Sequence, residues 1–128
     1  MKYMLLMNVP SGGPYQIFSW DPQDIQAHMT FMQGCVTRLS DAGELVAVEA
    51  LTAPDQAQHV RAGNDGQALT DGMFPETKEF LAGYWIVDVD SPERARTIAA
   101  EISAAPGPGR VPLRMVIEVR QLMAIPCT

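Results

Sequence analysis

The sequence predicts an α+β domain, because stretches with strand-like and helix-like patterns alternate along its 128 residues. Two segments carry a proline at what would be the first helical position, at 22 and 92, and four longer apolar stretches lie around them. The order is strand, helix, strand, hairpin, strand, helix, strand. Without the hairpin this is the split strand-helix-strand plan of ferredoxin-like folds, an antiparallel sheet with two helices on one face. We expect one domain spanning residues 1–128.

The strands are predicted from apolar runs bounded by turn residues. Residues 2–9 are apolar at nearly every position, which is typical of a strand covered on both sides. Three further strands are expected, at 44–51, 83–89 and 112–122. Residues 57–70 have the pattern of a β-hairpin insertion around the turn 63–66, and the weak hydrophobicity of its strands places it at the periphery.

The helices are predicted from their caps and their apolar periodicity. The first begins at Asp21-Pro22 and the second after Ser91, each with a capping side chain before proline. One stripe at helical spacing in the first helix is predicted to face the core. It consists of Ile25, Met29, Met32, Val36 and Leu39. His28 lies on the flank of this stripe.

The face of the sheet away from the helices is predicted to be a mixture of apolar and charged side chains. Tyr84 lies on this face, and large uncovered apolar groups usually mark an interface. We expect two sheets to pack face to face in a homodimer with a partly polar interior. Glu49, Arg114, Glu118 and Arg120 would then either pair with one another or hold a ligand.

Composition excludes several classes of function. The net charge is −6 with nine Lys plus Arg, which is unfavourable for binding nucleic acid or an anionic membrane surface. No window approaches the ~18 apolar residues of a membrane span, and the first ten residues are too short an apolar run for a signal peptide. We therefore expect a cytoplasmic protein. The two cysteines and two histidines stand at unrelated positions, so we expect no metal site. The sequence also has no glycine-rich phosphate loop, and we expect no cofactor.

The segment Thr70-Asp71-Gly72 permits two interpretations of its carboxylate. Asp before Gly is a turn signal, because Asp bonds its own backbone and Gly accepts positive φ. The same turn could present Asp71 as a working group. On the residues alone both readings stay open.

A run in the middle of the chain matches the signature of a known family. It comprises Thr70-Asp71-Gly72-Met73-Phe74, Glu76-Thr77-Lys78-Glu79 and Gly83-Tyr84-Trp85. Together with the first and last strands, this run makes the chain resemble the YCII-related superfamily over nearly its whole length, in the branch of DGPF-domain proteins. The chain departs from the family at Met73 and Gln121, where the signature has proline.

The resemblance implies a dimeric α+β barrel similar to muconolactone isomerases and a chlorohydroquinone dehydrochlorinase. It also implies a His–Asp catalytic pair, which carries over onto His28 and Asp71. An acid–base enzyme without cofactor, acting on a small cyclic or phenolic substrate, would follow. Its apolar wall would come from Phe74, Tyr84 and Trp85.

Arg114 or Arg120 would hold a substrate carboxylate in such an enzyme. The alternative is a non-catalytic module that binds a small molecule or a protein. Relatives in this branch are often encoded beside bacterial extracytoplasmic-function sigma factors, so a sigma factor is one such partner.

Overall fold

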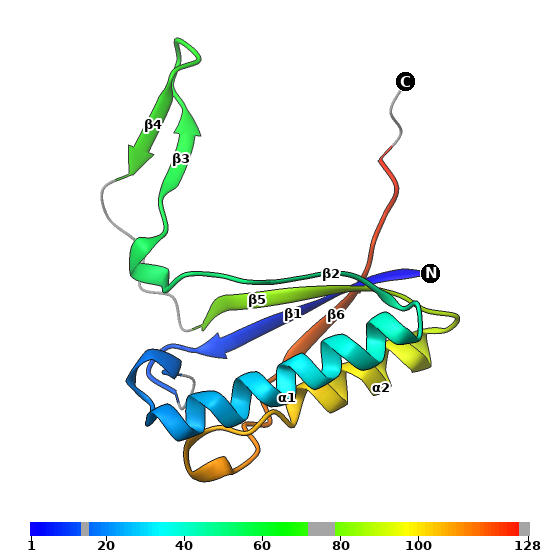
Figure 1. Ribbon diagram of the computed structural model, residues 1–128. Coiled ribbons are helices and arrows are strands. Elements are labelled where there is room, and N and C mark those ends of the chain that lie inside the picture. Colours follow the sequence, from blue (N-terminus) through cyan, green and yellow to red (C-terminus); the bar gives the residue numbers. More distant parts are fainter. Residues whose placement is uncertain (14–15, 72–78, 126–128) are drawn as a thin grey trace.

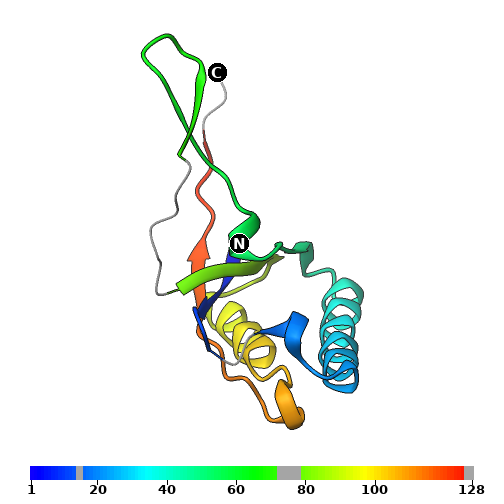
Figure 2. The ribbon, with the colours of Figure 1, turned by 90° about the vertical axis from the view of Figure 1, so that its left-hand side faces the viewer.

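The computed structural model describes residues 1–13, 16–71 and 79–125, apart from the side chain of Asp71. Its main sheet has four strands in the order β2-β5-β1-β6, with antiparallel neighbours throughout. They are β1 (Lys2–Pro10), β2 (Leu45–Ala50), β5 (Glu79–Asp88) and β6 (Ile117–Gln121). Helices α1 (Pro22–Asp41) and α2 (Pro92–Ser103) lie on one face of this sheet (Figures 1 and 2). The ferredoxin-like α+β prediction is confirmed.

The helix ends follow the capping signals of the sequence. Ser91 accepts a hydrogen bond from the backbone N–H of Arg94, and Pro92 occupies the first helical position of α2. Pro22 likewise occupies the first helical position of α1, although the side chain of Asp21 makes no capping hydrogen bond. Gly43 follows α1 at φ 71°, a conformation that favours glycine. These caps fix where both helices start and where α1 stops.

Two strand boundaries differ from the prediction. The last strand begins at Ile117 rather than at 112, because Arg114 has φ 52° and so interrupts the extended backbone. The strand expected at 83–89 begins earlier, at Glu79. The structure pairs Glu79 with Pro10 of β1.

The predicted hairpin is present as β3 (His59–Ala62) and β4 (Ala68–Asp71). Its two strands pair only with each other among the described strands, and they stand out from the main sheet on the side opposite the helices (Figure 1). Three short 3-10 helices complete the fold: η1 (Ile17–Ser19), η2 (Pro54–Gln56) and η3 (Pro108–Arg110). The hairpin leaves the body directly after η2.

The core lies between the sheet and the helices. From the sheet it takes Leu5, Trp85 and Val87, which are fully buried, and from α2 it takes Ile98 and Ile102. Alternate residues of β1 point into this layer, so the other residues of β1 point to the opposite face. α1 packs beside β2, and α2 packs beside β6.

The apolar stripe of α1 does not face this core as a whole, contrary to the prediction. Leu39 is buried, but Met29 is 55% exposed, and the buried side chains nearer the start of the helix are His28 and Cys35 on its flank. The wall opposite this part of α1 includes the small side chains of Ala50 and Ala82 among larger ones. The two alanines leave space under the stripe, and a cavity lies there.

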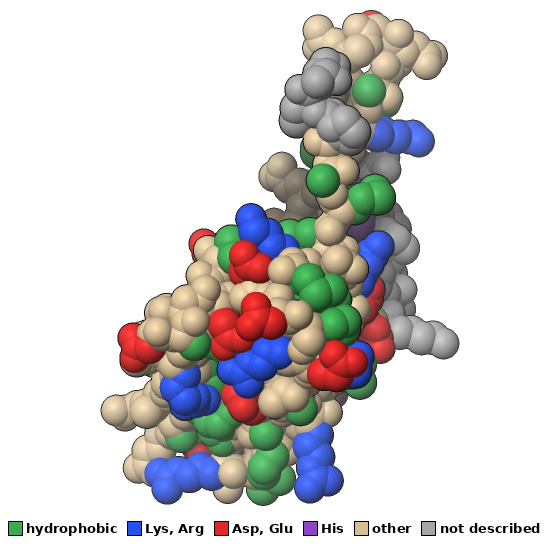
Figure 3. Space-filling model, turned by 90° about the vertical axis from the view of Figure 1, so that its right-hand side faces the viewer, with side chains coloured by type: hydrophobic (Ala, Val, Ile, Leu, Met, Phe, Trp, Pro, Cys, Tyr) green, Lys and Arg blue, Asp and Glu red, His purple; other side chains and the backbone are tan. Residues whose placement is uncertain are grey.

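The opposite face of the sheet is mixed, as predicted. Cross-strand pairing places Tyr84 beside Leu6 and Ile86 beside Met4, and all four are partly exposed. On the side of the molecule shown in Figure 3, acidic and basic side chains are interspersed and form no large patch of one sign.

Candidate ligand-binding pocket

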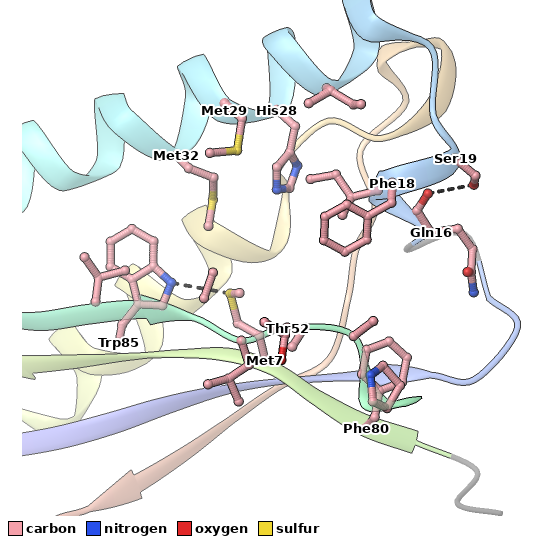
Figure 4. Close-up of a pocket in the computed structure, with 18 of the residues that line it drawn as sticks. Met7, Gln16, Phe18, Ser19, His28, Met29, Met32, Thr52, Phe80 and Trp85 are labelled. Atoms are coloured by element: carbon pink, nitrogen blue, oxygen red, sulfur yellow. Dashed lines mark hydrogen bonds between the residues drawn. The ribbon is translucent and has the colours of Figure 1, made fainter. Parts of the chain in front are cut away.

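A cavity of about 710 Å³ opens between the first half of α1, η1 and the end of β2. This volume lies within the roughly 300–1,000 Å³ of pockets that bury small-molecule ligands. Its walls come from three places: the stripe of α1, the chain around η1 and η2, and the helix-facing side of the sheet (Figure 4). The cavity therefore lies on the β2 side of the helix layer.

The lining of the cavity is largely apolar. Met29 and Met32 project from α1, and Met7 and Trp85 lie across from them on the sheet (Figure 4). Phe18 of η1 is 82% exposed and stands at the rim. Such a surface binds apolar ligands, because covering it removes apolar area from water.

Trp85 is held in place by a contact at the base of the cavity. Its indole Nε1 donates a hydrogen bond to Sδ of Met7, at 3.4 Å. The ring is fully buried, so its faces are packed while one part lines the cavity. This contact gives the sheet-side wall a fixed shape.

His28 is the titratable side chain among the described residues that line the cavity. It is 2% exposed, and its ring points from α1 toward the sheet (Figure 4). Nδ1 lies 2.9 Å from the carbonyl oxygen of Pro106. Because a carbonyl can only accept, Nδ1 is the donor, and in the neutral ring the basic nitrogen is Nε2.

The environment of His28 favours its neutral form. Burial lowers the pKa of His28 below its usual value, and the hydrogen bond to Pro106 offsets part of this shift. The ring also meets Trp20 edge to face, with 5.4 Å between centroids. These contacts set the orientation of the imidazole. A neutral, oriented imidazole in an apolar cavity can accept a proton from a bound molecule.

The predicted site residues fall into two groups on opposite faces of the sheet. Trp85 lines the cavity on the helix side, whereas its neighbour Tyr84 points to the other face. The structure therefore does not bring these two aromatic residues together in one wall. Glu49 pairs with Tyr84 across β2 and β5, so it also belongs to the face away from the helices.

The predicted charged residues of the last strand lie away from the cavity. Glu118 and Arg120 are on the face away from the helices, where their side chains approach to 3.7 Å. Glu118 also accepts a hydrogen bond from Asn8. Arg114 is exposed and precedes β6. None of these three side chains lines the cavity within the described part of the chain.

The expected His28–Asp71 pair is placed only in part. Asp71 is the last residue of β4, opposite His59 in the hairpin, and its side chain lies outside what the structure describes. Phe74 and the rest of 72–78 also lie outside the described residues. β4 stands on the side of the sheet opposite α1, which carries His28 (Figure 1). The pair stays a prediction.

Several lining residues were not singled out from the sequence. They include Met7, Phe18, Thr52 and Phe80, which lie far apart in the chain. The usable signal was the row of methionines in the stripe of α1, because Met is common at adaptable binding surfaces. That row was interpreted as core.

No group of three or more His, Cys, Asp or Glu is placed to hold a metal ion in 1–13, 16–71 and 79–125. Over the same residues no helix is long and apolar enough to cross a membrane.

Two comparisons relate the chain to known proteins. A family model described as the YCII-related domain matches residues 1–120. An uncharacterised protein of Rhizobium meliloti (strain 1021) is 28% identical over 87 residues, which span 68% of this chain and 70% of the relative. The relative has no stated function, so the two matches bear on family and not on activity.

Proposed function

The chain belongs to the YCII-related family, and we propose that it uses this fold to bind a small, largely apolar molecule in the cavity between α1 and β2. The observation that carries the proposal is the buried imidazole of His28, oriented by Pro106, at the wall of a largely apolar cavity of ligand size. Apolar walls supply affinity, and a few polar groups set orientation.

His28 would act there as a general base or acid. With Nδ1 donating to Pro106, Nε2 takes a proton from a phenolic O–H or from a carbon next to a carbonyl, and returns it elsewhere. Isomerisation needs only such transfers. Elimination also needs a leaving group on the substrate, which departs as the electrons of the broken C–H bond form the double bond. The proposed activity is therefore an acid–base isomerase or lyase reaction on a cyclic or phenolic substrate.

The test is a comparison of wild type with His28→Asn. The amide nitrogen of Asn can replace Nδ1 as donor to Pro106, while the basic nitrogen is lost. A panel of phenols and lactones would be followed by NMR for binding and for turnover. We expect binding within a few-fold of wild type and turnover lowered by at least about 100-fold.

Each other outcome has a definite meaning. Binding of panel members by both proteins without turnover would favour the non-catalytic module over the enzyme. Turnover that survives in His28→Asn would remove His28 from the chemistry. Absence of binding by wild type would contradict the proposed pocket.

We also propose that the chain forms a homodimer through the face of the sheet away from the helices. Its centre is apolar, with Leu6 and Ile86 partly exposed. The β2 edge carries Glu49, and the β6 edge carries Arg120. A two-fold axis parallel to the strands places the β2 edge of one protomer over the β6 edge of the other. Glu49 then lies level with Glu118, and Arg120 lies two residues further along β6.

Leu6→Glu tests the dimer, because it places a charge at the centre of this face. We expect wild type to sediment as a dimer at micromolar concentration and Leu6→Glu as a folded monomer. Val111→Glu adds the same charge at a 64% exposed position outside the face, and it should leave the dimer intact. A monomeric wild type, or a Leu6→Glu protein that dimerises as before, would contradict the proposal.

A further inference from the structure

We infer that the ligand of the cavity is an uncharged, flat molecule of two or three fused rings that carries a hydroxyl group. This inference rests on the proposed pocket and deepens it by naming a ligand class. Three features of the cavity support it: the charge of its walls, their shape and the position of His28.

The composition of the walls favours an uncharged ligand. Among the described residues, the cavity is lined by no Asp, Glu, Lys or Arg. Its polar side chains are His28, Gln16, Ser19, Gln33 and Thr52. Burying an ion without an opposite charge carries a large desolvation cost, which amide and hydroxyl groups offset only in part. A neutral ligand avoids this cost.

His28 does not change this conclusion. Burial lowers the pKa of His28 and favours the uncharged ring, so it offers no positive charge to a carboxylate at neutral pH. The arginines expected to hold a substrate carboxylate, Arg114 and Arg120, do not line the cavity. The walls that the described residues form therefore favour a neutral ligand over an acid, which a similar pocket with an arginine would accept.

The two facing walls of the cavity favour a flat ligand. Met29 and Met32 on α1 face Met7 and Trp85 on the sheet (Figure 4). Unbranched, polarisable thioethers adapt to a ring and make favourable contacts with aromatic groups. A flat ligand can lie between these walls. The volume of about 710 Å³ has room for more than one ring, and each added ring covers more apolar wall, which favours fused rings.

The polar group is placed by His28. Its imidazole projects into the apolar space between the two walls (Figure 4). A ligand hydroxyl that reaches the ring makes a hydrogen bond in a low-dielectric site, where the bond is stronger than in water. A hydrocarbon of the same shape would gain no such bond.

The test uses three matched probes that differ in charge: 2-naphthol, 2-naphthoate and 2-(aminomethyl)naphthalene, which are neutral, anionic and cationic at pH 7. Isothermal titration of the full chain should show 2-naphthol binding at least about tenfold more tightly than either ion. Phenol, with one ring, should bind more weakly than 2-naphthol by about tenfold or more.

A charge placed in the wall sharpens the test. Met29→Lys puts a cation at a 55% exposed lining position, and we expect it to strengthen 2-naphthoate binding by about tenfold. Thr30→Lys changes the net charge equally at the next residue, which is exposed and does not line this cavity. That control should bind all three probes as wild type does.

The outcomes separate this inference from the proposed pocket. An ion that binds wild type as tightly as 2-naphthol would overturn the ligand class and leave the pocket standing. Probes that bind but respond equally to Met29→Lys and Thr30→Lys would place their site elsewhere and overturn both. Absence of binding by all three probes would also overturn both.

Discussion

At the scale of single residues, His28 has two roles that depend on the same contact. The hydrogen bond from Nδ1 to Pro106 joins α1 to the segment after α2, and it also fixes which nitrogen is basic. Burial stabilises the neutral ring over the charged one. A base that is oriented before its ligand arrives loses little freedom on binding.

This environment predicts how stability depends on pH. The pKa of His28 is lowered in the folded protein, so below the usual value near 6.5 the unfolded chain binds more protons than the folded one. The contribution of neutral His28 is complete above that pH and is lost as the pH falls below it. Urea unfolding at pH 7.5, 6.5 and 5.5 should show a falling free energy of unfolding in wild type.

The matched variant is again His28→Asn, which has no titrating ring. Its free energy of unfolding should change less over the same pH range. The pKa of Glu44 is lowered mainly by its hydrogen bonds to Arg94. Glu44 therefore changes the free energy of unfolding only at more acidic pH, below its usual pKa near 4.5. Parallel pH curves for wild type and His28→Asn would contradict the assignment.

At the scale of elements, the position of β2 against β5 decides the shape of the cavity. Gly83 of β5 lies so close to β2 that an added Cβ would sit 2.7 Å from the carbonyl oxygen of Glu49. The backbone of β2 at Glu49 cannot move aside as the flexible end of a side chain can. Glycine at 83 therefore permits the strand pairing that brings Ala50 to the cavity wall.

Two glycine substitutions should have opposite effects on stability. Gly83→Ala forces β2 and β5 apart and should lower the free energy of unfolding by about 2 kcal/mol. Gly34→Ala, in α1, meets only the end of Arg38 at 3.4 Å and should raise it by about 0.5–1 kcal/mol through helix propensity. Urea denaturation measures both. Equal effects would show that strand spacing at Gly83 is not limiting.

The elements also show what the sequence can predict. Proline after a capping residue placed the start of α2, and the hairpin turn at 63–66 followed from local chemistry. The cavity did not follow, because it depends on which residues stand opposite the stripe of α1. Ala50 and Ala82 are 32 positions apart, and only strand pairing brings them to one wall. A periodic apolar stripe looks the same whether it meets large side chains or a space.

At the scale of the whole molecule, the sheet divides the chain into two working surfaces. The helix side holds the cavity with His28 and Trp85, and the other side holds the proposed dimer face with Tyr84 and Arg120. The sequence predicted the mixed character of the second face from alternation alone. It could not separate the site residues by side, because the neighbours Tyr84 and Trp85 alternate across the sheet.

The measurement that tests the central claim most directly is an NMR titration of the His28 ring, with ¹⁵N-labelled imidazole, in the presence and absence of 2-naphthol. We expect a neutral ring protonated at Nδ1 at pH 7, a pKa of His28 below the usual value, and ring chemical shifts that change until 2-naphthol saturates the cavity. A His28 ring that is charged or protonated at Nε2 at pH 7, or whose signals stay fixed while 2-naphthol binds, would contradict it.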